Sequence, residues 1–309
     1  MTQERDFINK TVGEAYDIGL RAAKEGRVAD YIPELAKANP NSFGIHVLYP
    51  DGGYLGLGDT STRFSAQSVA KVIILAAALT YFGFDETFSH VMMEPSGDSF
   101  NSIIKLDVRS NLPFNPMINP GAIQTVSLLA GKLSFGQLLR FSRTLCKDNG
   151  IVIDEDVYRS EFETGDRNRA IAYLLKSKNV LMSEPEKTID LYFKMCSLSV
   201  TAKSLASLGL IIANNGIDPE TGEQLIADEY ARTLKSIMFT CGMYDYSGEF
   251  GVRVGVPSKS GVGGGLVCAA KGPIGIGFYG PALDPYGNSI AAVRAMEHIS
   301  KKLGLHIFS

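Results

Sequence analysis

The longest apolar run of the chain directly follows a serine and a lysine. This run, residues 72–79, reads Val-Ile-Ile-Leu-Ala-Ala-Ala-Leu, a composition typical of a helix that is buried on all sides. Two short extended segments precede it, Phe43–Tyr49 and Gly53–Leu57, and the intervening Pro50-Asp51-Gly52-Gly53 predicts a hairpin turn. We therefore expect Ser68 at the start of a buried helix.

The remaining pattern predicts one sheet to which both ends of the chain contribute. Helical patterns occupy residues 5–38, 201–213, 227–240 and 289–303, and residues 254–279 read as three strands with glycine turns. We expect a mixed α/β (α+β) fold, in which an antiparallel sheet is flanked by helices and a mostly helical segment is inserted.

No repeat or low-complexity linker divides the chain, so a single unit with soft internal boundaries is expected. We place an α/β lobe at about residues 1–75 and 241–309, and a helical lobe at about 76–240. At 309 residues, with 45% hydrophobic and 20% charged residues, the chain can bury a large core.

Charge and targeting signals narrow the classes of partner. The formal net charge is −3 and no basic block is present, which argues against nucleic acid and anionic membranes and favours a small molecule. The start, Met1-Thr2-Gln3-Glu4-Arg5-Asp6, is charged and lacks a signal-peptide pattern, so a cytoplasmic location is expected. Four widely spaced cysteines without a Cys-x-x-Cys pair are typical of reduced, buried thiols.

Ser68 and Lys71 are three residues apart and would share one face of the helix. A buried, neutral lysine is a base that can activate a serine nucleophile, and the helix start would stabilise an oxyanion beside Ser68. The spacing alone is not specific, because Ser102-Ile103-Ile104-Lys105 repeats it. The alternative is that Ser68 is a simple N-cap and Lys71 a solvated residue of the first turn.

A late segment, Lys259-Ser260-Gly261-Val262-Gly263-Gly264-Gly265, favours the catalytic interpretation. Enzymes of the penicillin-binding and β-lactamase type combine a Ser-x-x-Lys helix with a late Lys-(Ser/Thr)-Gly strand. Glycines in an extended segment indicate close backbone approach, so this strand would flank the nucleophile. We expect Val262 to donate the second oxyanion N–H, and Lys259 to bring positive charge to an anionic substrate.

Other motifs fail on their context. Gly275-Ile276-Gly277-Phe278-Tyr279-Gly280 matches a dinucleotide pattern, but Pro281 follows and no helix begins there. The four histidines are isolated and lack metal-ligand spacing. We therefore expect no cofactor and no metal.

The chain resembles the serine-dependent glutaminases, a family with the β-lactamase-like (β-lactamase/transpeptidase-like) fold. The resemblance runs from about Val28 to Ala291 and rests jointly on these segments: Val28–Pro33, Gln67–Val72, Glu94–Gly97, Asn115–Asn119, Asp166–Ala170, Cys241–Asp245 and Lys259–Gly264. It implies hydrolysis of L-glutamine to L-glutamate and ammonia through a γ-glutamyl-serine intermediate, and a homodimer or homotetramer.

The resemblance also implies the roles of individual residues. Ser68 would be the nucleophile, Lys71 its base and Tyr244 an active-site tyrosine that relays the proton. The substrate-binding residues would be Tyr31, Ser68, Asn119, Glu161, Asn168, Tyr192, Tyr244 and Val262. The chemistry agrees, because a zwitterionic substrate needs a carboxylate for its ammonium, here Glu161, and neutral donors for its carboxylate.

Two positions depart from the family's pattern as the resemblance defines it. Pro120 stands where alanine is usual and would bias Asn119 toward extended geometry, and Met195 stands where glutamine is usual. Two further interpretations also remain open. One keeps the fold but changes the substrate to a β-lactam or D-alanyl peptide, and the other is a non-catalytic amino-acid-binding protein.

Overall fold

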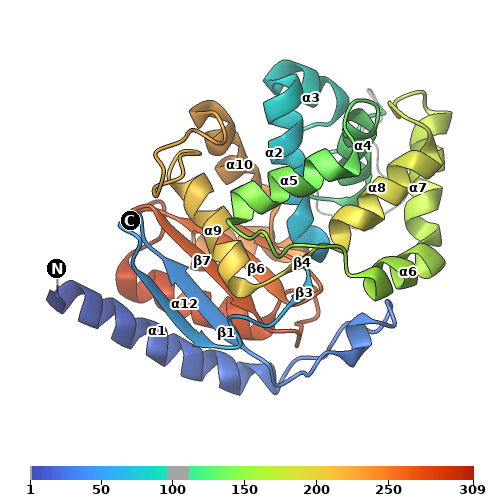
Figure 1. The fold of residues 1–309 in the computed structure, drawn as a ribbon. Coiled ribbons are helices and arrows are strands. Elements are labelled where there is room, and N and C mark those ends of the chain that lie inside the picture. The colour runs from blue at the N-terminus through green and yellow to red at the C-terminus, as the bar shows by residue number, and fades with distance from the viewer. Residues whose placement is uncertain (1, 96–110) are drawn as a thin grey trace.

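The core of the protein is a five-stranded antiparallel sheet (Figure 1). The computed structural model describes residues 2–95 and 111–309. In spatial order β2-β1-β7-β6-β5, the strands are Tyr54–Gly58, Gly44–Leu48, Ile274–Tyr279, Gly265–Ala270 and Ser258–Ser260. Strand β1 pairs with β7, for example at His46↔Gly277, so both chain ends build the sheet as the sequence pattern predicted.

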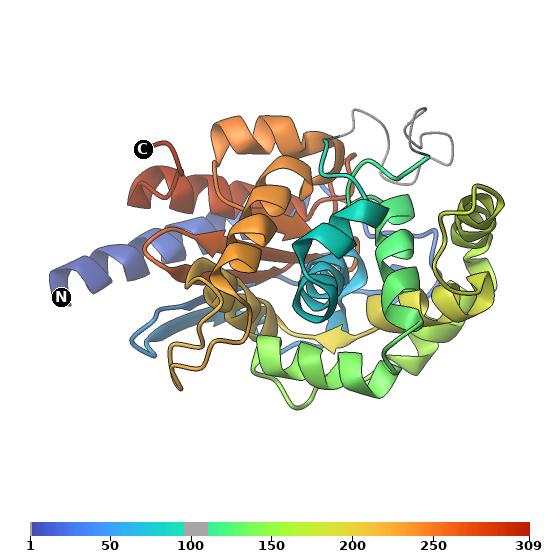
Figure 2. The ribbon, with the colours of Figure 1, turned by 90° about the horizontal axis from the view of Figure 1, so that it is seen from above.

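One face of the sheet is covered by the two terminal helices, α1 (Thr2–Ala23) and α12 (Ile290–Leu303), which lie side by side (Figures 1 and 2). Alternate strand residues such as Ile45 and Ile276 join this apolar layer, because successive side chains of a strand point to opposite faces. Ser289 caps α12 by accepting from the Ala292 N–H, so this helix begins where the sequence predicted.

The other face of the sheet is covered by α9 (Ala202–Ala213). A Cβ at Gly277 would lie 2.0 Å from the Ala202 carbonyl oxygen, and one at Gly275 would lie 2.1 Å from that of Ala206. These glycines therefore allow helix and strand backbones to approach closely. The dinucleotide-like motif is thus part of strand β7 and its end, in agreement with its rejection from the sequence.

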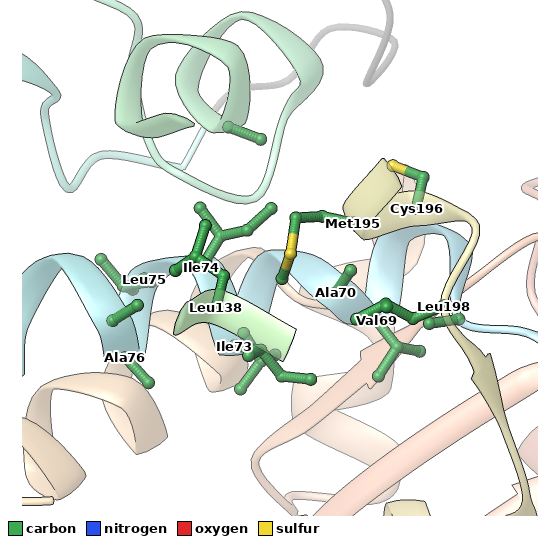
Figure 3. Close-up of a cluster of buried hydrophobic side chains, with 14 of the residues drawn as sticks. Val69, Ala70, Ile73, Ile74, Leu75, Ala76, Leu138, Met195, Cys196 and Leu198 are labelled. Atoms are coloured by element: carbon green, nitrogen blue, oxygen red, sulfur yellow. The ribbon is translucent and has the colours of Figure 1, made fainter. Parts of the chain in front are cut away.

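A largely helical region packs around α2 (Ala70–Phe82), whose residues 70–79 are all buried (Figure 3). Its other helices are α3 (Phe84–His90), α4 (Asn119–Ala130), α5 (Phe135–Cys146), α6 (Glu155–Thr164), α7 (Asp166–Ser177), α8 (Pro185–Cys196) and α10 (Asp228–Cys241). Because α2 is apolar on every side, it needs this complete shell of neighbours. The short helix α11 (Ser247–Arg253) contacts α10, and its Phe250 joins the apolar layer of the terminal helices.

Short elements connect the helical region to the sheet. Strand β3 (Phe64–Ser65) pairs with β4 (Ser199–Val200), and 3-10 turns lie at Leu35–Lys37 (η1), Gln67–Val69 (η2) and Tyr244–Tyr246 (η3). Helix α9 lies within the expected helical lobe by residue number, but it packs on the sheet and so connects the two expected lobes. The boundaries of these lobes stay a prediction. Among the described residues, no helix has the length and apolarity needed to cross a membrane.

Candidate active site

Ser68 lies in the η2 turn between strand β3 and helix α2. Val69, rather than Ser68, is the N-cap of α2, so the alternative of Ser68 as a simple N-cap is wrong. The preceding residue, Gln67, has φ 47°, a left-handed conformation that is uncommon outside glycine. Because α2 begins at Ala70, the positive end of its dipole lies beside Ser68 and favours negative charge there.

The glycine-rich segment after β5 packs directly on this turn. A Cβ at Gly261 would lie 2.8 Å from the Ala66 carbonyl oxygen, and one at Gly263 would lie 2.4 Å from that of Ser65. Only a residue without a side chain permits such an approach. The expectation that this strand flanks the serine is therefore confirmed.

Lys71 is completely buried, so its interpretation as a solvated residue is wrong. Among the described residues, its Nζ donates to the Met117 carbonyl oxygen at 3.2 Å and to Oδ1 of Asn119 at 2.7 Å. Burial lowers the pKa of Lys71 to about 8, although Cys196 and Glu161 oppose this shift. Lys71 can therefore lose its proton near neutral pH, as a general base must.

Tyr244 lies against Ser68 on the side of the sheet. Burial raises the pKa of Tyr244, against the opposing effect of hydrogen bonds with the Ser68 side chain and the Val262 backbone N–H. Tyr244 itself has φ 54°, a second left-handed residue beside the serine. Tyr244 thus contacts both Ser68 and the Val262 N–H, the expected oxyanion donor.

A cavity of about 440 Å³ opens in front of Ser68. Six of the residues expected to bind substrate share its lining: Tyr31, Ser68, Asn119, Glu161, Asn168 and Tyr192. They come from separate elements, since Tyr31 follows α1 whereas Tyr192 lies in α8. Six of the eight expected substrate-binding residues therefore converge on one pocket, whereas Tyr244 and Val262 do not belong to its lining.

A larger cavity of about 820 Å³ lies on another side of Tyr244. Apolar side chains such as Phe239, Val252 and Phe308 contribute to its lining, and among the described residues Tyr244 is the only expected site residue there. The smaller cavity is the better candidate because it alone joins the serine to groups that can bind both ends of an amino acid.

Asn119 joins the substrate-binding residues to the base. Besides accepting from Lys71, its side chain donates to Oδ1 of Asn168 at 3.0 Å and lies 3.4 Å from the Tyr192 hydroxyl. Helix α4 begins at Asn119, with Pro120 in its first turn, where a missing N–H costs no hydrogen bond. The expected extended bias of Asn119 is thus wrong, and the helix start directs its side chain into the pocket.

Glu161 is buried near the end of α6 and faces the same cavity. Burial raises its pKa to about 7, against the opposing effects of Gln67 and Lys71. Gly165 separates α6 from α7, as the sequence predicted, and a Cβ there would lie 2.3 Å from the Phe193 ring. This break allows Glu161 and Asn168 to line one pocket from two different helices.

Lys259 does not face the substrate as expected. Its amine is completely buried, bound to the carbonyl oxygens of Gly242 and Ser260, and does not belong to the lining of the smaller cavity. The short strand β5 directs this side chain inward, because all three of its residues are buried.

Sequence reasoning missed six residues of the pocket lining, namely Ile32, Gln67, Thr164, Gly165, Arg167 and Cys196. These residues lie in or near the segments that carry the family resemblance, but no spacing rule selected them. Met195 is fully buried and lies against α2 in the apolar core (Figure 3). It therefore packs rather than lining the pocket.

In residues 2–95 and 111–309, no group of three or more His, Cys, Asp or Glu side chains could hold a metal ion. The second pair, Ser102 and Lys105, lies outside the described residues.

Solved structures share this architecture. The covalent complex of the Bacillus subtilis glutaminase YbgJ with 5-oxo-L-norleucine, formed by reaction with 6-diazo-5-oxo-L-norleucine, aligns with a TM-score of 0.86 at 38% identity, over 97% of this chain and 98% of that chain. Mglu in its glutamate form aligns with a TM-score of 0.90 at 35% identity, over 98% of this chain and 69% of that chain. The fold is accordingly of the β-lactamase-like class.

Sequence relatives identify the family within this fold class. Glutaminase 2 of Clostridium perfringens (strain 13 / Type A) is 49% identical over 289 residues, which span 92% of this chain and 95% of the relative. The family model described as Glutaminase matches residues 26–308. The chain belongs to the glutaminase family and is an amidohydrolase enzyme.

Proposed function

We propose that the protein hydrolyses L-glutamine to L-glutamate and ammonia through a γ-glutamyl-Ser68 intermediate. The observation that carries this proposal is the pocket itself: one cavity contains Ser68 together with Glu161 and Asn168, which can bind the two charged groups of an amino acid. The ammonium would pair with the Glu161 carboxylate, and the carboxylate would accept from Asn168 and Tyr192. Tyr31, 57% exposed, would line the entrance.

The first half-reaction acylates Ser68. Its hydroxyl proton passes through Tyr244 to neutral Lys71, while Oγ bonds to the γ-carbonyl carbon of the substrate. The backbone N–H groups of Ser68 and Val262 hold the resulting oxyanion, an arrangement in which one donor is typically worth about a hundred- to a thousandfold in rate. Lys71 then returns the proton to the departing nitrogen, the C–N bond breaks and ammonia leaves.

The second half-reaction releases the product. A water molecule gives a proton to the same Tyr244 and Lys71 pair and attacks the ester carbon. Collapse of the second oxyanion breaks the bond to Ser68, which recovers its proton, and L-glutamate leaves. The family resemblance further supports a homodimer or homotetramer. We include this assembly in the proposal, together with the cytoplasmic location expected from the sequence.

Two assays of the purified protein test the function: ammonia release from glutamine and from asparagine, and ring opening of a penicillin, which releases no ammonia. We expect ammonia from glutamine, and Ser68→Ala should abolish it. Hydrolysis of the penicillin alone would instead assign a β-lactam substrate. Tight glutamine binding without ammonia release would assign a non-catalytic binding protein.

A further inference from the structure

Lys259 and Tyr244 form a buried pair beside the proposed nucleophile. The Nζ atom of Lys259 lies 4.2 Å from the centre of the Tyr244 ring. The same amine donates to the carbonyl oxygens of Gly242 at 3.0 Å and Ser260 at 2.5 Å, and the residue has no exposed surface. Lys259 therefore binds the ring of Tyr244 and also the backbone two residues before it.

These neighbours favour an ammonium over a neutral amine. A neutral amine would use its two N–H groups on the two carbonyls and would turn its lone pair toward the negative face of the ring. An ammonium instead directs its third N–H at that face, which is an attractive cation–π arrangement. Burial and the charge of Lys71 lower the pKa of Lys259 well below its ordinary value. The two carbonyl acceptors and the ring face oppose this shift, because each interacts more strongly with an ammonium than with a neutral amine.

Tyr244 needs such a support because its own backbone is unfavourable. Its φ of 54° places a bulky residue in the left-handed region, a conformation that typically costs on the order of 1–3 kcal/mol. The Gly242 carbonyl that Lys259 binds also accepts from the Ser260 N–H at 3.1 Å, which joins this turn to β5. Lys259 thus fixes the turn and the ring together.

We propose that Lys259 is a positioning residue for Tyr244: its ammonium holds the ring against Ser68 and stabilises negative charge on the Tyr244 oxygen while the serine proton passes through it. This inference rests on the proposed function, because it gives the proton relay through Tyr244 its electrostatic support. Lys259 does not line the substrate cavity; it positions Tyr244, and its charge also acts on Lys71.

The pH dependence of turnover separates this role from a purely structural one. Besides Ser68 and Lys71, the titratable groups around the pair are Tyr31, Cys196, Cys241 and Asp284. The charge of Lys259 opposes protonation of Lys71 and favours ionisation of Tyr244. Loss of this charge therefore raises the pKa of both groups. Both effects move the rising limb of the kcat profile to higher pH.

The experiment compares Lys259→Met with the wild-type enzyme, after turnover of glutamine by the wild type has been established. We expect kcat to fall about tenfold to a hundredfold, as for a misplaced reacting group, with KM within about twofold. The midpoint of the rising limb should move up by about half a unit to one unit. Lys259→Gln, which keeps two N–H donors without the charge, serves if the methionine variant does not fold.

Lys271→Met is the matched control. Lys271 also donates to two backbone carbonyls, those of His306 and Ser309, but it is exposed and does not line the pocket. This control should keep the kcat, KM and midpoint of the wild type. An unchanged midpoint in folded Lys259→Met or Lys259→Gln would overturn the inference and leave the proposed function intact, whereas a wild type without glutaminase activity would defeat both.

Discussion

The amine of Lys71 donates a hydrogen bond to the side-chain oxygen of Asn119, 2.7 Å away. The same asparagine donates to Asn168 at 3.0 Å, so the proposed base and the proposed carboxylate-binding groups form one network. Asn119 offers Lys71 a neutral acceptor, which binds either protonation state without the strong preference for the ammonium that a carboxylate would impose. Replacement of the Asn119 side chain should therefore change the pKa of Lys71.

Asn119→Asp places a carboxylate beside Lys71 and should raise its pKa above the value of about 8. We expect kcat at pH 7.5 to fall about a hundredfold or more, with partial recovery as the pH is raised toward 10. Steady-state kinetics across this range measure the effect. Asn119→Ala is the control, because it removes the hydrogen bond without adding charge; an equal upward shift of the midpoint in that variant would contradict the explanation.

Glu161→Gln should weaken substrate binding more than it affects folding. Loss of the carboxylate that pairs with the substrate ammonium should raise KM about tenfold to a hundredfold, the range for a charged hydrogen bond. Glu163→Gln, an exposed neighbour on the same helix, should leave KM unchanged. A KM equal to that of the wild type in Glu161→Gln would mean that the ammonium binds elsewhere.

At high pH, Glu161→Gln should stabilise the folded protein relative to the wild type, although it weakens substrate binding. The folded-state pKa of Glu161, about 7, lies above its ordinary value of 4.5, so the stability associated with the protonated form is lost as the pH rises through 7. Glu161→Gln cannot ionise. We therefore expect the Tm of Glu161→Gln, measured relative to that of the wild type, to be higher at pH 8 than at pH 5.

Gly261→Ala should separate the glycine-rich strand from the serine turn. The added methyl group would lie 2.8 Å from the Ala66 carbonyl oxygen, so either the strand or the turn must move and the Val262 N–H would be displaced with it. We expect kcat to fall about a hundredfold, as when an oxyanion donor is lost. Gly13→Ala is the control, because nothing lies within 4 Å of its added Cβ; comparable losses in the two variants would contradict the geometric explanation.

The wild-type pH profile follows from two requirements that act in the same direction. Glu161 must be ionised to bind the ammonium, and Lys71 must be neutral to act as base, with pKa values of about 7 and about 8. Both groups reach the required form by losing a proton, so kcat/KM should rise with pH between 6 and 9. A profile that falls across this range would exclude a neutral lysine as the base.

The sequence could predict the elements and their order because these depend on local patterns. The apolar run after Lys71 could only be a buried helix, and the glycines after Lys259 indicated close backbone approach. Contacts between residues far apart in the sequence could not be predicted in this way. The contact between Asn119 and Asn168 joins residues 49 positions apart, and no helical periodicity relates them.

Two features of the site could not be read from composition or spacing at all. The left-handed backbone of Gln67 depends on tertiary packing, since glutamine has no local preference for φ 47°. Lys259 was expected to face the substrate because its motif suggests a charged strand residue. Its inward direction is instead set by the register of β5 against β6, which buries all three residues of β5.

The central claim is that Ser68 forms a covalent bond to the substrate carbonyl group. The most direct measurement is mass spectrometry of the protein after incubation with 6-diazo-5-oxo-L-norleucine, a diazoketone analogue of glutamine, followed by peptide mapping. The account predicts one adduct per chain, equal in mass to the reagent less dinitrogen, on the peptide that contains Ser68, and none in Ser68→Ala. An adduct on any other residue, or an equal adduct in Ser68→Ala, would contradict it.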